Sequence, residues 1–408
     1  MKKSDVLIIG GGPSGAVAAA NLAQKGFSVE VVEKLDFPRF VIGESLLPQC
    51  NAILAKNNLL DRITEQGYTL KAGAIFEKED TEKKIYHFRE NIGEPHNTTF
   101  QVKREEFDYE LLKGAASFGA NVTHGVEVTA YNQDKNLVTA IDRDGNTLEY
   151  KARFVLDCSG YGRVLPRFLD LEIPSEFKTR KAIFTRIEND IRPEGELGGY
   201  ITIFVHGEND AWIWVIPFAD GTTSIGVVCS DEYYDKNHMN QEDFLDYIIE
   251  NTPKVKARMK NANKLQEVGK IDGYSSNVKT MHGKGFALAG NATEFLDPVF
   301  SSGVTLALVS GDLAADCIAR ELKGEDINWQ TEYEDYMIEG INVFRDFVLA
   351  WYDGRLHQVF FSDIEKESFT RSISSILSGY VWNKNNVFVG NSKDKIDLLI
   401  KMINARPE

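Results

Sequence analysis

The distribution of hydrophobic residues near the start of the chain predicts a strand, a helix and a second strand in immediate succession. Residues 5–9 (DVLII) form a short β-branched apolar run, which is typical of a strand buried on both faces. An alanine-rich segment at 16–25 predicts a helix that ends at Gly26, and the apolar run at 28–32 ends in Glu33. The chain therefore begins with a βαβ unit.

Further along the chain the pattern changes from helical spacing to strand alternation. Residues 98–120 look helical, and short strands near 121–131 and 137–142 precede a buried strand at 154–156. Between about 181 and 230, four apolar runs are separated by turn residues (AIFTRIE, YITIFVH, AWIWVIPF and TSIGVVC), which indicates an antiparallel sheet. A buried strand returns at 286–289, and residues 303–321 predict a long helix.

These elements predict an α/β fold with three parts. We expect a discontinuous Rossmann-like nucleotide-binding domain (1–70, 98–180 and 266–330), an inserted antiparallel β-sheet domain that binds substrate (71–97 and 181–265) and a helical C-terminal region (331–408). The C-terminal region is rich in aromatic residues, which either cover a substrate cavity or pack as plain core: Phe344, Phe347, Trp351, Tyr352, Phe360 and Phe361.

Composition and charge exclude several classes of protein. The formal net charge of −15 over 408 residues disfavours binding to nucleic acid or to an anionic membrane. The four cysteines lie far apart and no metal-ligand spacing occurs, so we expect no metal site and a reducing, cytoplasmic location. No continuous run reaches the roughly 18 apolar residues of a spanning helix, so we expect no stable membrane insertion.

The first glycine-rich turn is the strongest motif. Gly10, Gly12 and Gly15 have GxGxxG spacing directly after a predicted strand and at the start of a predicted helix. They permit a tight turn, close approach of backbone N–H groups to a pyrophosphate, and close packing of helix on strand. Glu33, at the end of the next strand, is placed to accept hydrogen bonds from ribose hydroxyls. The turn therefore predicts a dinucleotide site.

A second segment favours FAD over NAD as the dinucleotide. A late buried strand leads into Gly290 and Asn291, and Pro298 and Gly303 then lead into a helix. Two separated sites fit a long flavin nucleotide, whereas a second GxGxxG for NAD(P)H is missing from the sequence. A reduced nicotinamide is therefore expected to bind only transiently, or a separate flavin reductase supplies the electrons.

Four segments together resemble a known superfamily, the FAD-dependent halogenases and aromatic monooxygenases, which have a para-hydroxybenzoate hydroxylase-like fold and are related to geranylgeranyl reductases. The segments are GGGPSG at 10–15, GESLLP at 43–48, DCSG at 157–160 and DPVFSSGV at 297–304. The resemblance, together with the first motif, assigns FAD binding to these residues: Gly10, Gly12, Pro13, Ser14, Gly15, Glu33, Lys34, Arg39, Glu44, Ser45, Arg104, Val128, Asp157, Gly160, Asn291, Pro298, Ser301, Gly303 and Val304.

The resemblance is closest to flavin-dependent halogenases, because Trp212 to Pro217 (WIWVIP) match their WxWxIP signature. It implies that Trp212 and Trp214 lie beside the flavin and hinder direct oxygen transfer to the organic substrate. The alternative is an amphipathic strand whose alternate tryptophans fill the interface between the sheet and the nucleotide domain.

Lys71 resembles the active-site lysine of halogenases, which guides hypohalous acid to an aromatic ring. The alternative is a solvated lysine that precedes an edge strand. Ser302, in the late segment, is the remaining catalytic candidate. Arg104 matches a VxRxxFD pattern whose arginine approaches the cofactor, or else it pairs with Glu105, Glu106 or Asp108 on a solvated helix.

Two positions depart from the halogenase pattern. Asn291 replaces the usual aspartate after the late strand, and Glu77, Lys78 and Glu79 replace the tryptophan-glycine ending of the GAxF strand in carrier-linked halogenases. The second departure weakens the halogenase assignment more than the FAD assignment.

The resulting hypothesis is an FAD-dependent oxidoreductase that acts on an aromatic or apolar small molecule, free or tethered to a carrier protein. The resemblance implies a flavin C4a-hydroperoxide that either oxidises halide or transfers oxygen directly to the substrate. Two alternatives stay open: a reductase or dehydrogenase of the geranylgeranyl reductase kind, and a non-catalytic flavin-binding protein.

Overall fold

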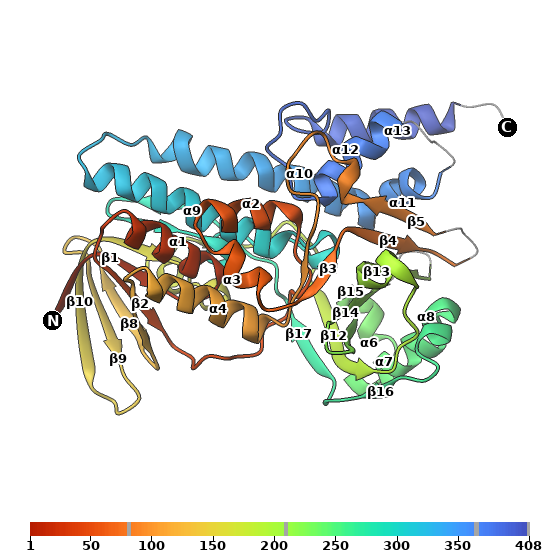
Figure 1. Cartoon of the computed structure of the whole chain (residues 1–408), viewed down its shortest axis with the longest axis horizontal. Coiled ribbons are helices and arrows are strands. Elements are labelled where there is room, and N and C mark those ends of the chain that lie inside the picture. The colour runs from red at the N-terminus through yellow and green to blue at the C-terminus, as the bar shows by residue number, and fades with distance from the viewer. Residues whose placement is uncertain (80–82, 208–210, 363–366, 406–408) are drawn as a thin grey trace.

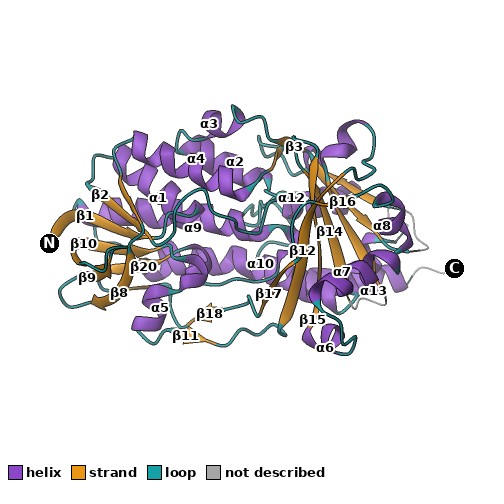
Figure 2. Ribbon diagram, turned by 90° about the horizontal axis from the view of Figure 1, so that it is seen from below, coloured by secondary structure: helices purple, strands orange, loops and turns teal. Residues whose placement is uncertain are grey.

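Two large β-sheets lie at opposite ends of the molecule, and long helices run between them (Figures 1 and 2). The computed structural model describes residues 1–79, 83–207, 211–362 and 367–405. The helices α9 (Ser302–Leu322) and α10 (Asp335–Tyr352) cross the middle of the molecule and connect the two ends. The predicted α/β class is confirmed.

The first sheet has the parallel core of a nucleotide-binding domain. Strand β1 (Lys2–Ile9) pairs in parallel with β10 (Thr147–Asp157) on one side and with β2 (Val29–Glu33) on the other. The order of the sheet is β19 (His282–Gly283), β20 (Phe286–Leu288), β10, β1, β2 and β7 (Asn121–His124). Strand β9 (Leu137–Ile141) pairs antiparallel with β10, and β8 (Glu127–Asn132) pairs antiparallel with β9. The interior of β1 is fully buried, as its apolar run predicts.

Helices α1 (Pro13–Gln24), α4 (Arg104–Ser117) and α9 pack beside one another over this sheet (Figure 1). Helix α1 begins at Pro13, three residues before the predicted start, because extended Gly12 is its N-cap and proline suits the first helical position. Shorter helices α2 (Pro48–Lys56) and α3 (Leu60–Thr64) continue this layer, and α5 (Val164–Phe168) lies beyond the end of β10.

The second sheet is mainly antiparallel, as predicted. Its order is β16 (Asn263–Lys264), β12 (Arg180–Glu188), β15 (Thr222–Ser230), β14 (Ala211–Pro217), β13 (Ile201–His206), β4 (Gly73–Glu77) and β5 (Lys84–His87), and β17 (Gly269–Asp272) also pairs with β12. The pairing of β13 with β4 is parallel, which the sequence did not indicate. Helices α6 (Asp231–Asp235), α7 (Gln241–Glu250) and α8 (Pro253–Arg258) cover its outer face (Figure 1).

Strand β14 contributes to two separate cores because its side chains alternate between the faces of the sheet. Trp212, Trp214 and Ile216 belong to the main core toward the nucleotide domain. Ile213 and Val215 belong to a second core beneath α7 and α8. Both tryptophans therefore lie on the face of β14 that is opposite to the second core.

One predicted element differs in the structure. Residues Thr99–Gln101 are not helical but form β6, which pairs with β3 (Thr69–Lys71), so the helix α4 begins only at Arg104. This short strand depends on a partner thirty residues earlier in the chain, which local spacing does not reveal. Small strands β11 (Glu172–Ile173) and β18 (Asn277–Val278) also pair with each other.

The C-terminal helices α10, α11 (Arg355–Phe360), α12 (Glu367–Leu377) and α13 (Ser392–Asn404) pack along one side of both sheets (Figure 1). Of the two alternatives for the aromatic residues of this region, core packing holds for Phe344, Phe347, Trp351 and Phe360, which are buried in the main core. Helix α9 is long and apolar enough to cross a membrane, but 83% of that window is buried inside the protein, as in a core helix.

Candidate functional site

One cavity of about 850 Å³ extends from the glycine turn before α1 to the tryptophans of β14. Both the nucleotide domain and the second sheet contribute to its wall. Most residues predicted from the sequence to bind cofactor or substrate line it together: Gly10, Gly12, Pro13, Ser14, Glu33, Lys34, Arg39, Glu44, Ser45, Arg104, Val128, Gly160, Trp212, Trp214, Asn291, Pro298, Ser301, Gly303 and Val304.

The glycine turn needs glycine for two different reasons. A Cβ on Gly10 would lie 2.4 Å from the Cys158 carbonyl oxygen, and one on Gly15 would lie 2.0 Å from the Gly10 carbonyl oxygen. A Cβ on Gly12 would meet only the Arg39 guanidinium, at 3.4 Å. Gly10 and Gly15 therefore serve the fold, whereas Gly12 leaves space in the cavity beside the N-terminus of α1. Gly15 itself does not line the cavity.

The N-terminus of α1 suits an anionic group. The helix has no side-chain cap at Gly12 and no acidic residue in its first turn. Its first backbone N–H groups and the positive end of its dipole thus have no capping side chain from the helix itself.

Glu33 fixes the glycine turn from the end of the neighbouring strand β2. Its carboxylate accepts hydrogen bonds from the Gly11 N–H at 2.8 Å and from the Leu35 N–H at 2.9 Å. The side chain lies at the carboxyl end of β2, which is the position predicted for a ribose-binding acid.

Arg104 is buried, so the alternative of a solvated helix is wrong, although its predicted pairing with Asp108 is present. Its guanidinium donates to the Asp108 carboxylate at 2.7 and 3.0 Å and to the carbonyl oxygens of Ile42 and Gly43. Arg39 also donates to Asp108, at 3.0 Å. The fully buried Asp108 thus holds two arginines against the cavity wall.

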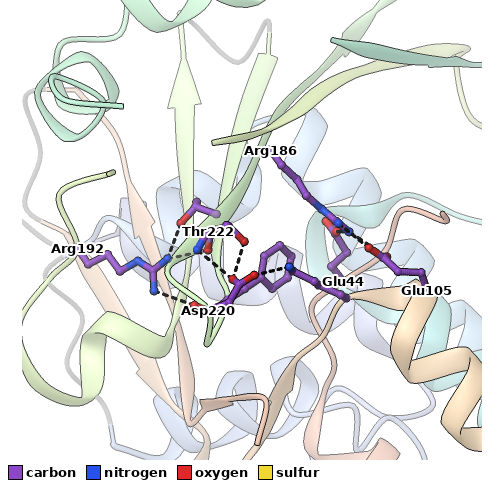
Figure 3. A network of polar contacts seen from close by, with 9 residues as sticks. Glu44, Glu105, Arg186, Arg192, Asp220 and Thr222 are labelled. Atoms are coloured by element: carbon purple, nitrogen blue, oxygen red, sulfur yellow. Dashed lines mark hydrogen bonds and ion pairs between the residues drawn. The ribbon is translucent and has the colours of Figure 1, made fainter. Parts of the chain in front are cut away.

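Glu44 lies in a network of charges where the two domains meet (Figure 3). Arg186 of β12 donates to the Glu44 carboxylate at 3.0 Å and to Glu105 at 2.9 Å. Burial raises the pKa of Glu44. Within the described part of the chain, Glu44 Oε2 and Ser45 Oγ are buried and have no hydrogen-bond partner. Two unsatisfied polar atoms on the wall of a cavity indicate a polar ligand.

Figure 3 also shows how the turn between β14 and β15 is held. Asp220 accepts hydrogen bonds from the backbone and hydroxyl of Thr222 and pairs with Lys103, which precedes α4. Arg192 donates to the backbone of Phe218 and Thr222. These contacts fix the end of β14, and with it the tryptophans, relative to the nucleotide domain.

Trp212 and Trp214 are 3% and 5% exposed and lie with ring centroids 5.9 Å apart. Trp214 Nε1 donates to Ser224 at 3.0 Å, and Trp212 Nε1 donates to the hydroxyl of Tyr352 at 2.9 Å. Tyr352 is the residue of the aromatic C-terminal region that reaches the wall of the cavity through this bond. Each indole is therefore fixed in orientation by its single donor.

Lys71 is 1% exposed, so the alternative of a solvated lysine is wrong. Its ammonium donates to the Leu46 carbonyl oxygen at 2.7 Å and lies 5.3 Å from the centroid of the Phe88 ring. Burial lowers the pKa of Lys71 to about 7, although the neighbouring thiol of Cys50 opposes this. A lysine with such a pKa can exchange a proton at neutral pH. Its side chain does not line the cavity, however.

Two further predicted residues lie behind the cavity wall rather than on it. Asp157 accepts hydrogen bonds from the Ser159 and Leu165 N–H groups and so shapes the turn that presents Gly160. Burial raises the pKa of Asp157. Ser302 is buried at the start of α9, next to Ser301 and Gly303, which do line the cavity.

Several cavity residues were not found by sequence reasoning because they lie outside the motifs, in loops or in short helices such as α5. Among them are Phe40, Tyr161, Arg167, Phe168, Tyr274 and Phe295. The only signal available was proximity to motifs, as for Tyr161, which directly follows the DCSG segment. Tyr274 has no such neighbour in the sequence.

The fold and the cavity define a flavin nucleotide-binding protein, and comparison with known families agrees. The chain belongs to the FAD binding domain family, whose description matches residues 3–334. Within this family it is a member of the FAD-dependent halogenase superfamily, as the comparisons with individual proteins show.

The similar curated proteins are halogenases. The chain is 29% identical to the 1H-pyrrole-2-carbonyl-[peptidyl-carrier protein] chlorinase of Pseudomonas fluorescens, over 99% of this chain and 94% of that protein. It is 30% identical to the 1H-pyrrole-2-carbonyl-[peptidyl-carrier protein] brominase of Pseudoalteromonas luteoviolacea, over 82% of this chain and 81% of that protein.

Two solved structures share the whole fold. A flavoprotein/dehydrogenase from Cytophaga hutchinsonii is 42% identical with a TM-score of 0.94, covering 99% of both chains. The flavin-dependent brominase Bmp2 is 25% identical with a TM-score of 0.87, also covering 99% of both chains. The protein is therefore an FAD-dependent, halogenase-like oxidoreductase.

The residues present fit FAD. The uncapped helix N-terminus suits a pyrophosphate, Glu33 suits a ribose, and the unpartnered Glu44 and Ser45 oxygens lie on the wall of the same cavity. The tryptophans and the 298–304 segment complete the wall at the other end.

Proposed function

We propose that this protein is a flavin-dependent halogenase that attaches chloride or bromide to an aromatic ring. The observation that carries the proposal is that Trp212 and Trp214 line the same cavity as the glycine turn and the 298–304 segment. Two indoles fixed by hydrogen bonds leave little freedom for an organic substrate to approach the isoalloxazine ring directly.

FAD, when bound and reduced, supplies the reaction of dioxygen with halide. The protein binds the pyrophosphate at the start of α1 and the ribose at Glu33. Arg39 and Arg104, held by Asp108, contribute positive charge to the wall beside the cofactor. Trp212 and Trp214 exclude water from this end of the cavity.

Lys71 is the proposed guide for hypohalous acid. Burial holds the pKa of its ammonium at about 7, so the side chain can donate a hydrogen bond or accept a halogen at neutral pH. Its contact with the Leu46 carbonyl places it directly behind the Glu44–Ser45 segment of the cavity wall. Access from the cavity to Lys71 would require that segment to move.

The proposed substrate is an electron-rich aromatic acyl group, free or tethered to a carrier protein. Support comes from the similar chlorinase and brominase, whose names specify pyrrolyl groups on peptidyl carrier proteins. We further propose that a separate flavin reductase supplies electrons from NAD(P)H and that the enzyme works in the cytoplasm, where its four buried cysteines stay reduced.

The test combines the purified protein with FAD, a flavin reductase, NADH, oxygen and either chloride or bromide. Pyrrole-2-carbonyl groups are offered on a carrier protein and as the free amide, and products are identified by mass. We expect halogenated product that is lost in Lys71→Met but retained in Lys284→Met, which removes an exposed lysine. Hydroxylated product that survives Lys71→Met would reject halogenation in favour of a monooxygenase.

A second candidate is hydride transfer to an apolar substrate, as in geranylgeranyl reductases. One observation favours it: the Lys71 ammonium bonds the protein backbone and does not line the cavity. Substrate reduction without oxygen would support this candidate, whereas product that requires oxygen would reject it. A bound flavin that no donor reduces would instead indicate a non-catalytic flavin-binding protein.

A further inference from the structure

A chain of hydrogen bonds connects the wall of the cavity to its tryptophans. Trp212 Nε1 donates to the Tyr352 hydroxyl at 2.9 Å, and Tyr352 donates to Asp297 Oδ2 at 2.8 Å. The hydroxyl of Tyr274 lies 3.3 Å from the same carboxylate oxygen. Tyr274 and Trp212 both line the cavity, so the chain begins and ends on the wall of one site.

The hydrogen bonds of this chain run toward Asp297. The indole N–H of Trp212 can only donate, so the Tyr352 oxygen accepts it, and the hydroxyls of Tyr352 and Tyr274 donate to Asp297 Oδ2. The backbone N–H of Val299 donates to the other oxygen of Asp297 at 3.1 Å. Each of these partners therefore presents hydrogen to the carboxylate, which is the arrangement that suits its ionised form.

The surroundings of Asp297 keep the chain in place. Asp297 is 2% exposed, and burial raises its pKa, whereas the charge of Arg180 and the hydrogen bonds from Tyr352, Val299 and Tyr274 oppose this shift. The guanidinium of Arg180 lies 3.2 Å from the centroid of the Tyr352 ring. The ring of Phe295 packs edge-on against Tyr274, which limits the rotation of that side chain.

We infer that Tyr274 recognises the N–H or O–H group of an aromatic substrate, and that Asp297 makes it an acceptor for that group. Because Tyr274 directs its own proton to the carboxylate, the lone pairs of its oxygen are left for a donor in the cavity. A ring with an N–H or O–H donor, such as a pyrrole or a phenol, satisfies this oxygen. A ring with an acceptor at the same position does not.

This inference rests on the proposed function only in that an aromatic ring occupies the cavity beside FAD; it does not depend on halogen transfer. It adds a residue that selects substrates by hydrogen-bond polarity. A site that hydrogen-bonds a substrate donor rejects an analogue without that donor, because a buried polar group is then left unpaired.

The test measures binding, without oxygen, halide or an electron donor. Pyrrole-2-carboxamide and furan-2-carboxamide have the same shape, but the furan oxygen replaces the N–H donor. Each is titrated into the oxidised, FAD-loaded protein, and the dissociation constant is taken from the change in the flavin absorption spectrum. We expect the pyrrole to bind about tenfold more tightly, which corresponds to about 1.4 kcal/mol.

Variants separate recognition from folding. Tyr274→Phe should weaken binding of the pyrrole and bring the two affinities within about twofold of each other. In Asp297→Asn the amide can donate to Tyr274, which turns the tyrosine into a donor, so the preference should vanish or reverse. The matched control is Tyr131→Phe, which removes a hydroxyl bonded to Asn136 away from the cavity and should keep the preference.

The outcomes distinguish this inference from the proposed function. Equal affinity of the wild-type protein for the two amides, no binding of either, or a preference that survives Tyr274→Phe would overturn the inference even if halogenation is observed. A preference that depends on Tyr274 would stand even if no halogenated product forms. FAD affinity is measured for every variant, and for the control Tyr131→Phe it should stay within about twofold of the wild-type value.

Discussion

Replacing Lys71 with methionine should make the protein more stable by an amount that depends strongly on pH. The pKa of Lys71 is lowered from 10.5 to about 7 by burial, a difference of about 3.5 units. At about 1.36 kcal/mol per unit, the protonated lysine costs the folded state about 5 kcal/mol. Methionine has a similar length and no charge, so the variant avoids this cost.

The direction of the pH dependence of stability follows from how many protons the folded and unfolded states bind. Between about pH 7 and pH 10.5 the unfolded chain binds a proton at Lys71 that the folded chain does not, so wild-type stability rises with pH across this window. The cost is complete below pH 7 and absent above pH 10.5. The stability gained by Lys71→Met should therefore be about 3 kcal/mol larger at about pH 6 than at about pH 9.5.

The assay is equilibrium unfolding in urea of the flavin-free protein at both pH values, for the wild type, Lys71→Met and Lys284→Met. Loss of the hydrogen bond to the Leu46 carbonyl lowers the stability of the first variant by about 1 kcal/mol at both pH values, so it cancels in the comparison. Lys284 is exposed, so Lys284→Met should change the free energy of unfolding by the same amount at both pH values. A Lys71→Met effect that is equal at both pH values would refute the reasoning, since it would mean that the ammonium is hydrated.

Three other substitutions test the glycine turn and the arginine pair beside the cavity. Gly12→Ala should change the free energy of unfolding of the flavin-free protein by less than about 0.5 kcal/mol, because the added Cβ has space there. The same substitution should weaken FAD binding, measured by flavin fluorescence, at least about tenfold, because the pyrophosphate needs that space. Gly15→Ala should instead destabilise the flavin-free protein by about 3 kcal/mol in urea unfolding, because its Cβ overlaps a backbone carbonyl; unchanged stability would contradict this. Asp108→Ala should cost about 3–5 kcal/mol in the same assay, because two arginines lose their shared carboxylate; a loss below 1 kcal/mol would show that water replaces it.

The parts of the fold that sequence reasoning predicted are those that the backbone dictates locally. The turn at Gly10 follows from steric limits that only glycine meets, and the β-branched run of β1 follows from burial on both faces. The strand β6 was missed because it exists only through its pairing with β3.

Sequence reasoning likewise predicted some parts of the candidate site and missed others. Most of the predicted residues within motifs line one cavity, but Gly15, Asp157 and Ser302 do not, and neither does Lys71. The chain formed by Tyr274, Asp297 and Tyr352 could not be predicted, because its members are separated by 23 and 55 residues and only Asp297 belongs to a motif. Their association depends on where the end of α10 meets the second sheet, which is a property of tertiary packing.

The side chains of β14 alternate between the two faces of the sheet, so substitutions on the two faces have different consequences for ligand binding. Substitutions at Trp212, Trp214 and Ile216 reshape the chamber, while Ile213 and Val215 anchor the strand to a separate layer on its far side. Substitutions at the first set therefore change the cavity and the main core together, whereas the second core beneath α7 and α8 keeps its contacts with β14. Ligand binding and the second core thus depend on side chains on opposite faces of the same strand.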